Sequence, residues 1–196
     1  HKFVLKRIPK ILCVSHILIK MLNEFYGIPK KKLFKVPPPL LSSKFTMYPR
    51  KTPSKPNVLF IGRLFKLKGG EVILKNLDKF INNCNLTMVT NDVKANIKGI
   101  KYFNNNLSDE EILNLYKTND ILILPCFFDT FGAVIAEASS AGLAVITTKF
   151  VIGSKDIIVN NKTGIITDTQ EQCIDELVKL IKNPQKIDDF KIAGYN

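Results

Sequence analysis

Short apolar runs alternate along the chain with segments whose apolar residues recur every three to four positions. The apolar runs predict strands at 11–15, 57–62, 85–90, 100–103, 120–125 and 143–148. The periodic segments predict helices at about 16–26, 70–82, 109–118, 132–141 and 170–182. Several strands are apolar on both faces, which is typical of a parallel sheet covered by helices. The alternation therefore predicts an α/β fold with a doubly wound parallel sheet.

Signals at the ends of these helices support the pattern. Ser108 and Glu111 form a capping-box sequence before the third predicted helix. Gly27 and Gly142 follow predicted helices and suit C-terminal caps, and Pro184 follows the last one. We therefore expect helix boundaries near these residues.

A proline-rich stretch divides the chain. Residues 37–56 contain six prolines and show little periodicity, which predicts a linker. We expect a short front piece before this linker and a compact module of about 140 residues after it.

Composition indicates a globular protein. Of the 196 residues, 45% are hydrophobic and 23% are charged, which excludes a disordered tail. No segment approaches the roughly 18 to 20 continuous apolar residues of a membrane-spanning helix, and no signal-peptide region opens the chain, so we expect a cytoplasmic protein. The cysteines are far apart and beside apolar runs, which predicts buried free thiols. With two histidines and no CxxC sequence, we expect no metal site.

The charge of the chain is strongly positive. Lysine and arginine number 29 against 17 acids, a formal net charge of +12, so nucleic acid, an acidic membrane and a phosphorylated small molecule are all candidate partners. The densest basic cluster is Lys30, Lys31, Lys32 and Lys35. No aromatic residues alternate with bases as single-strand binding usually requires. We interpret most lysines as solvated surface, and charge alone leaves the partner open.

The connection after the strand at 57–62 is a candidate anion site. Ligands of open α/β sheets bind beyond the carboxyl ends of the strands. The sequence there is RLFKLKGG, in which Arg63 and Lys68 are suited to a diphosphate. Two solvated loop cations are an equally good interpretation, because the GxGxxG and GxxxxGK[ST] sequences are both absent.

A second candidate follows the strand at 120–125, in the segment PCFFDTFGAVIAEASSAG. A helix that begins near Gly132 would present the N–H groups of Phe131, Gly132 and Ala133 to an anion. Glu137 lies five residues further, roughly 7 to 8 Å along the helix axis, which is the reach from a diphosphate to the ribose of the same nucleotide. A ribose-binding role would explain an acid in so apolar a helix.

Structural roles for the acids of this segment also stay open. Glu137 would then pair with a neighbouring lysine, and Asp129 or Thr130 would only cap the helix. We favour ligand binding for Glu137 and leave both interpretations of Asp129 open.

The chain resembles the C-terminal, nucleotide-sugar-binding half of the retaining glycosyltransferases of family 4, which have the GT-B fold of two Rossmann-like domains. Four matching segments stand in order and cover most of residues 11 to 167: ILCVSHILIKMLNEFYGIPKKKLFKVPPPLLSSKF, LFIGRLFKLKGG, LSDEEILNLYKTNDILILPCFFDTFGAVIAEASSAGLAVITT and GSKDIIVNNKTGIIT. The four segments together are specific to this family, although each segment alone is a weak indication of it.

The resemblance implies a role for each matching residue. Arg63 and Lys68 would bind the donor diphosphate, Asp129 the donor sugar and Glu137 the ribose. These four would form the catalytic set. The implied donor-binding residues are Gly62, Arg63, Lys68, Asp129, Thr130, Phe131, Gly132, Ala133 and Glu137. Such enzymes use a nucleotide diphosphate-sugar and usually no metal, and we expect no cofactor. Fixed cations and helix amides would instead stabilise charge on the departing diphosphate.

The chain departs from the family at several positions. Asp129 and Asp156 stand where glutamate is usual, Pro39 where glycine is usual, and Leu41 where aspartate is usual. TNDVKAN replaces a glycine-rich turn.

The resemblance also implies a division of the chain. Residues 1–52 would be a remnant of the acceptor domain plus linker, and residues 53–196 the donor-binding domain. We expect this piece alone to be inactive, because a glycan or glycolipid acceptor would be bound mainly by the rest of the enzyme. We expect no nucleic acid partner, and the lysine cluster suits peripheral contact with the inner membrane face. The alternatives are a sugar-nucleotide epimerase of the same architecture and a non-catalytic nucleotide- or RNA-binding module.

Overall fold

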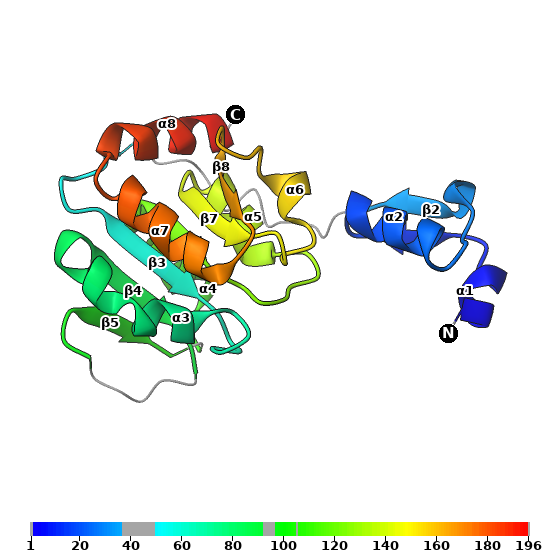
Figure 1. Cartoon of the computed structure of the whole chain (residues 1–196), viewed down its shortest axis with the longest axis horizontal. Coiled ribbons are helices and arrows are strands. Elements are labelled where there is room, and N and C mark those ends of the chain that lie inside the picture. Colours follow the sequence, from blue (N-terminus) through cyan, green and yellow to red (C-terminus); the bar gives the residue numbers. More distant parts are fainter. Residues whose placement is uncertain (1, 37–49, 92–96, 105, 196) are drawn as a thin grey trace.

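The computed structural model describes residues 2–36, 50–91, 97–104 and 106–195, and these residues form two separate parallel sheets (Figure 1). We call residues 2–36 the front unit and residues 50–195 the main unit. Residues 37–49, most of the predicted linker, lie outside the described residues, and the proposed domain boundary stays a prediction.

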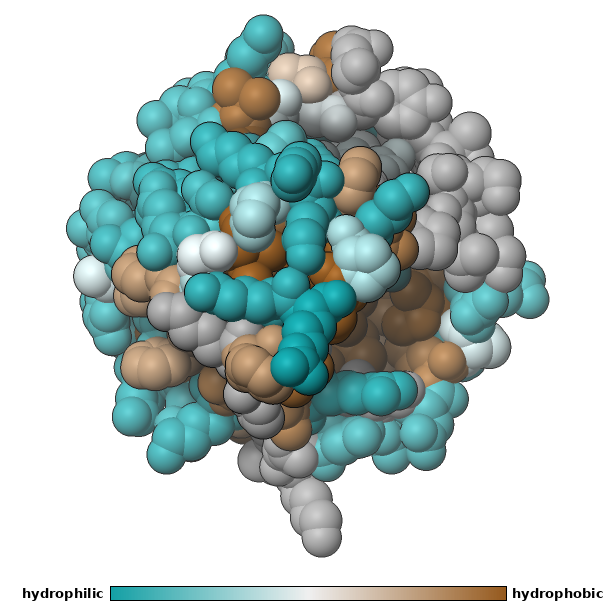
Figure 2. All heavy atoms as spheres, turned by 90° about the vertical axis from the view of Figure 1, so that its right-hand side faces the viewer, coloured by the Kyte–Doolittle hydropathy of each residue, from teal (hydrophilic) through white to brown (hydrophobic). Residues whose placement is uncertain are grey.

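The front unit is a small strand-helix-strand structure. Its elements are α1 (Lys2–Arg7), β1 (Ile11–Cys13), α2 (His16–Glu24), a 3₁₀ turn (Lys30–Lys32) and β2 (Leu33–Lys35). β1 pairs in parallel with β2, and Ser15 caps α2 by accepting from the N–H of Leu18 at 3.1 Å. A core of Cys13, Ile28 and Leu33 lies beneath α2. Seen from the end that carries this unit, the surface is mostly hydrophilic, with apolar residues in a hollow (Figure 2).

The main unit contains six parallel strands in the order β5-β4-β3-β6-β7-β8. The strands are β3 (Asn57–Ile61), β4 (Asn85–Val89), β5 (Ile100–Phe103), β6 (Ile121–Leu124), β7 (Ala144–Thr148) and β8 (Gly164–Thr167). From β3 the chain runs outward to β5 and then crosses back to β6, so the direction of winding reverses between β3 and β6. The predicted doubly wound, Rossmann-like parallel sheet is confirmed.

Helices cover both faces of this sheet. They are α3 (Gly70–Lys75), α4 (Asp109–Thr118), α5 (Ala133–Ser140), α6 (Ser154–Ile157), α7 (Gln170–Leu180) and α8 (Pro184–Tyr195). Figure 1 shows α3 and α7 in front of the sheet and α4 and α5 behind it. α8 packs against α5 and β7. No helix in the described ranges combines the length and the apolar composition needed to cross a bilayer.

Most predicted elements are confirmed, with differences at their ends. The helix predicted over 70–82 stops at Lys75 and continues as two 3₁₀ turns, at 77–79 and 81–83. Pro184 follows α7, as predicted, and also begins α8, where its missing N–H costs nothing. The capping box of Ser108 is present, and Gly27 and Gly142 both adopt positive φ. Five helices and strands among the described residues were not predicted: α1, β2, α6, β8 and α8.

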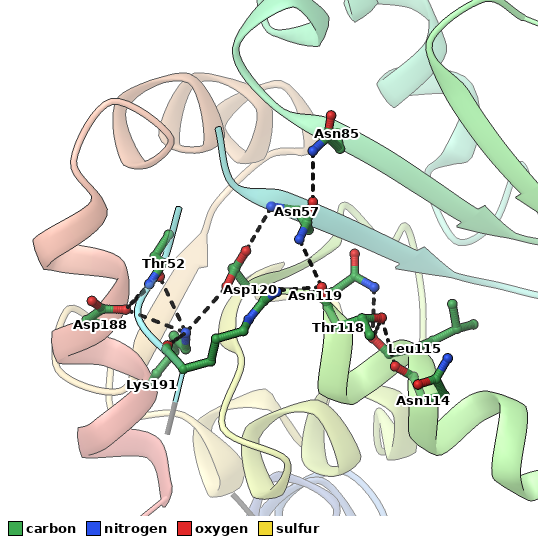
Figure 3. A network of polar contacts seen from close by, with 11 residues as sticks. Thr52, Asn57, Asn85, Asn114, Leu115, Thr118, Asn119, Asp120, Asp188 and Lys191 are labelled. Carbon is green, nitrogen blue, oxygen red and sulfur yellow. Dashed lines mark hydrogen bonds and ion pairs between the residues drawn. The ribbon is translucent and has the colours of Figure 1, made fainter. Parts of the chain in front are cut away.

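A buried polar network fixes the amino end of the sheet (Figure 3). Asp120, which is fully buried just before β6, accepts hydrogen bonds from Arg50 at 2.7 Å and from the backbone N–H of Asn57 at 2.9 Å. Lys191 on α8 is 4% exposed, lies 3.4 Å from Asp120 and donates to the carbonyl of Arg50 at 2.7 Å. Because a buried charge is costly without partners, this network ties α8 and the chain entering β3 to one place.

One polar cluster joins the two units. Asp156 in α6 accepts from the backbone N–H of His16, the first residue of α2, at 2.8 Å. Its other oxygen lies 2.5 Å from Nδ1 of His16 and 3.3 Å from Nζ of Lys35. Burial raises the pKa of Asp156, but the hydrogen bonds from His16 and Lys35 outweigh it and lower the pKa below its ordinary value. The carboxylate thus stays charged at the positive end of α2.

The four cysteines are free and buried, as predicted: Cys13, Cys84, Cys126 and Cys173. Burial raises the pKa of Cys84 to about 11 and that of Cys173 to about 12. Both thiols are therefore protonated and unreactive at neutral pH.

Candidate functional site

Three loops meet beyond the carboxyl ends of the central strands. The loop after β3 contacts the loop after β6, where the N–H of Phe127 donates to the carbonyl of Leu67 at 2.8 Å. The loop after β6 also pairs with the loop after β7. Asp129 donates its N–H to Phe150 and accepts from the N–H of Ile152 at 2.8 Å. These loops surround the reversal point between β3 and β6, where open α/β sheets bind ligands.

Glycines allow the loops to approach this closely. Gly69 has a φ of 85°, and a Cβ there would lie 1.9 Å from the carbonyl oxygen of Pro125. A Cβ on Gly62 would lie 2.7 Å from the Cβ of Lys68. No side chain fits at either position, so both glycines are needed to bring Lys68 against the loop after β6.

Lys68 and Asp129, two of the predicted site residues, form an ion pair. Nζ of Lys68 lies 2.5 Å from Oδ2 of Asp129, and their side chains are 20% and 21% exposed. Oδ1 of Asp129 accepts from the N–H groups of Phe131 at 3.1 Å and Gly132 at 3.0 Å. Both carboxylate oxygens of Asp129 are therefore engaged.

Asp129 occupies two of the three backbone N–H groups that were expected to bind a donor. Helix α5 begins at Ala133, one residue later than expected, and Gly132 precedes it with a φ of 86°. The N–H groups of Phe131 and Gly132, two of the three expected to face a donor, instead satisfy Asp129. The N–H groups of Ile135 and Ala136 donate to the carbonyl of Gly132. The start of α5 thus offers the N–H groups of Ala133 and Val134 to an anion.

Arg63 and Thr130 are both exposed. Within the described part of the chain, Arg63 has no recorded ion pair or hydrogen bond through its side chain, so the structure does not bring it to the Lys68 and Asp129 pair. Thr130 does not cap α5. Asp129 does not cap the helix with its side chain either: its oxygen accepts from two N–H groups of the turn before the helix, so the capping interpretation is not supported.

Glu137 is half-buried on α5 and has a neutral partner. The hydroxyl of Tyr116, in α4, donates to Oε2 of Glu137 at 2.8 Å. Burial raises the pKa of Glu137 above its ordinary value, and the hydrogen bond from Tyr116 opposes this shift. Burial and the neighbouring carboxyl raise the pKa of Tyr116 well above its ordinary value. The alternative that Glu137 pairs with a lysine finds no support among the described residues.

Sequence reasoning missed two features beside these residues. Tyr116 was read only as part of an amphipathic helix. Its position, five residues before a fully buried strand, was the one signal that it would be buried. The second feature is aromatic: Phe127 and Phe150 are exposed and stack with ring centroids 6.1 Å apart. Phe127 also borders a groove of about 660 Å³ lined by Leu64, Phe65 and Leu67 among others.

The lysine cluster of the front unit is divided by its contacts. Nζ of Lys32 donates to the carbonyls of Lys6 and Ile8, at 2.9 and 3.2 Å, and Lys35 contacts Asp156. Lys30 and Lys31 remain exposed on the 3₁₀ turn. Half of the cluster therefore has a structural role.

Comparison with known proteins gives a consistent result. Residues 48–196 match the family described as glycosyl transferases group 1. A D-inositol 3-phosphate glycosyltransferase of Paenarthrobacter aurescens is 29% identical over 136 residues, which cover 59% of this chain and 32% of the relative. The chain spans about three tenths of the length of the curated relatives it matches.

Solved structures show the same fold. Sucrose-phosphate synthase from Thermosynechococcus elongatus superposes with a TM-score of 0.81 at 16% identity, over 99% of this chain and 54% of that one. HepE of Anabaena in complex with UDP-glucose superposes with a TM-score of 0.78 at 13% identity, over 95% of this chain and 58% of that one.

Proposed function

Because the chain belongs to the glycosyl transferases group 1 family, we propose that its main unit binds the nucleotide diphosphate-sugar donor of a glycosyltransferase. The observation that carries this proposal is the arrangement around α5. Lys68 contacts Asp129 in the loop that leads into the helix, the N–H groups of Phe131 and Gly132 meet the other oxygen of this carboxylate, and Glu137 follows four residues after Ala133. The neighbour HepE, solved with UDP-glucose, supports a nucleotide-sugar as the class of ligand.

Each group then has a defined task. Lys68 and the N–H groups at the start of α5 hold the diphosphate, and Arg63, which is exposed in the same loop as Lys68, reaches it by a change of rotamer. We assign Asp129 to the sugar that is attached to the diphosphate. Glu137, about 6 Å further along the helix axis, accepts hydrogen bonds from the ribose hydroxyls.

The chemistry follows from the bond that breaks. When the bond between sugar C1 and the diphosphate oxygen breaks, the diphosphate departs with the electron pair and gains negative charge. Lys68 and the helix amides are fixed before the reaction and stabilise that charge, at roughly 3 to 4 kcal/mol per well-placed donor. We assign a transfer of the family 4 type. Retention of the anomeric configuration follows from the resemblance to that family, and independence from a metal follows because these groups supply the positive charge that a metal would otherwise supply.

We propose a glycan or lipid-linked acceptor that is bound mainly by parts of the enzyme beyond this chain, which spans about three tenths of its relatives. The chain alone should bind a donor and fail to transfer the sugar. Lys30 and Lys31 are the residues we assign to peripheral contact with anionic lipid.

Calorimetry with uridine, guanosine and adenosine diphosphates tests the donor site. The wild-type chain should bind at least one of them. Lys68→Ala and Glu137→Ala should each weaken it roughly 10- to 100-fold, because a hydrogen bond to a charged group contributes about 1.5 to 3 kcal/mol. Lys179→Ala is the matched control, because this lysine is 70% exposed on α7 and pairs with Glu176, away from the proposed site.

Two outcomes would favour the alternatives. No binding to any nucleotide, together with salt-sensitive binding to RNA, would support a non-catalytic RNA-binding module. Conversion of a nucleotide-sugar into its epimer would support the epimerase. That reaction needs acid and base residues, and His16 is already held at Asp156.

A further inference from the structure

Tyr116 contacts Glu137 across two elements that are distant in sequence. Tyr116 belongs to α4, which leads into β6, and Glu137 belongs to α5, which follows β6. The tyrosine is 2% exposed and packs within the main hydrophobic core. Packing therefore fixes the ring of Tyr116. Its hydroxyl donates to Oε2 of Glu137 at 2.8 Å.

This contact has two effects on Glu137: it partly restores the solvation of the carboxylate, and it restricts the side-chain rotamers. A half-buried glutamate loses solvation of its charge, and a phenol hydrogen bond to the carboxylate restores part of it. A glutamate side chain also carries rotamer freedom that costs up to roughly 1.5 to 2 kcal/mol to lose on binding a ligand. A partner that fixes one oxygen beforehand removes part of that cost.

The two carboxylate oxygens are used differently. Oε2 is occupied by Tyr116, whereas Oε1 has no recorded hydrogen bond within the described residues. We propose that Tyr116 is a positioning residue: it holds one oxygen of Glu137 so that the other is aimed at the ribose hydroxyls of the donor. This inference rests on the proposed function, since it concerns the same site.

A purely structural role for Tyr116 predicts different behaviour. If only the packing of the ring matters, Tyr116→Phe keeps the ring and should bind nucleotide as the wild type does. If the hydroxyl positions Glu137, Tyr116→Phe should weaken binding only of ligands that carry a ribose. In a protein that lacks the Glu137 side chain, Tyr116→Phe should not change the affinity for the nucleotide.

The test measures affinity by calorimetry with two probes. One is whichever of uridine, guanosine or adenosine diphosphate binds tightest, and the other is inorganic pyrophosphate, which lacks the ribose. Tyr116→Phe should bind the nucleotide roughly tenfold more weakly, as expected for the loss of one hydrogen bond to a charged group, and should bind pyrophosphate as the wild type does. In a Glu137→Ala background, adding Tyr116→Phe should change neither affinity.

Tyr102→Phe is the matched control. The hydroxyl of Tyr102, in β5, is also buried but has no hydrogen-bond partner among the described residues, so its removal should leave both affinities unchanged. Melting curves of all variants establish that each is folded. Three results would overturn the positioning role. Tyr116→Phe could bind the nucleotide as tightly as the wild type, or it could weaken the binding of pyrophosphate as much as that of the nucleotide. In the Glu137→Ala background, Tyr116→Phe could lower the nucleotide affinity further. Failure of the wild type to bind any nucleotide would instead overturn the proposed function, and this inference with it.

Discussion

Asp129 is held by the same kinds of group that bind phosphate. Lys68 contacts one of its oxygens, and the N–H groups of Phe131 and Gly132 contact the other. A diphosphate that approaches Lys68 therefore meets a competing carboxylate. The site can bind a donor only if the lysine is shared between the two anions or if Asp129 turns toward the sugar.

Replacing this carboxylate by its neutral isostere should strengthen the binding of a nucleoside diphosphate. Asp129→Asn removes one negative charge beside Lys68, and we expect the affinity to rise roughly threefold to tenfold, which corresponds to about 1 kcal/mol for a partly exposed pair. Calorimetry at low and moderate salt measures the change. Glu176→Gln, on α7, makes the same change of charge away from the site. Weaker binding by Asp129→Asn would show that Asp129 is needed to orient Lys68.

Some residues of the site could be predicted from the sequence, and others could not. Glu137 could be selected because an acid within an apolar helix needs a reason, and the structure shows it half-buried on α5. Its partner Tyr116 could not be selected, because the contact joins residues 21 positions apart and depends on how α4 and α5 pack. The pairing of Asp129 with the amides of Phe131 and Gly132 likewise depends on the turn that Gly132 makes at a φ of 86°.

At the scale of elements, the site depends on how closely the loop after β3 packs against the end of β6. Gly69→Ala should lower the free energy of unfolding by about 2 to 5 kcal/mol, since alanine is strained at this φ and its Cβ collides with backbone. Gly69→Ala should also weaken nucleotide binding, because Lys68 directly precedes Gly69 and would be displaced with it. Urea denaturation and calorimetry measure the two effects.

Gly27→Ala is the matched control for this substitution. Gly27 has a φ of 64°, but a Cβ there meets nothing within 4 Å. It should therefore cost only the conformational strain of about 1 to 2 kcal/mol and leave nucleotide binding intact. Equal losses of stability in the two variants, with nucleotide binding unaffected in both, would show that the close approach at Pro125 does not position Lys68.

The elements themselves were largely predictable. The central strands β6 and β7 are buried at every position, and uninterrupted apolar sequence reveals such strands. The missed strand β2 is buried at only one of its three positions, and the missed strand β8 contains only two apolar residues, Ile165 and Ile166, so neither shows an extended apolar run. The break after Lys75 was also missed, because the residues beyond it keep a helical spacing while their backbone tightens into 3₁₀ turns.

At the scale of the whole molecule, the two ends of the main sheet have different roles. The amino end is closed by the buried network of Asp120, Arg50 and Lys191, which fixes α8 and the chain entering β3. The carboxyl end carries loops, an ion pair and a helix start that remain partly exposed. The doubly wound sheet predicted from the sequence pointed to this end, but Arg50 and Lys191, which help to close the other end, lie outside the predicted helices and strands.

The central claim is that a nucleotide diphosphate binds at the carboxyl ends of β3 and β6. Its most direct test is a titration of the ¹⁵N-labelled chain with uridine, guanosine or adenosine diphosphate, followed by the amide shifts in ¹⁵N–¹H spectra. The account predicts that the largest shifts fall on Lys68, on Asp129 and on residues 131–134. Shifts that gather instead around Asn57 and Asn85, at the opposite end of the sheet, would contradict it.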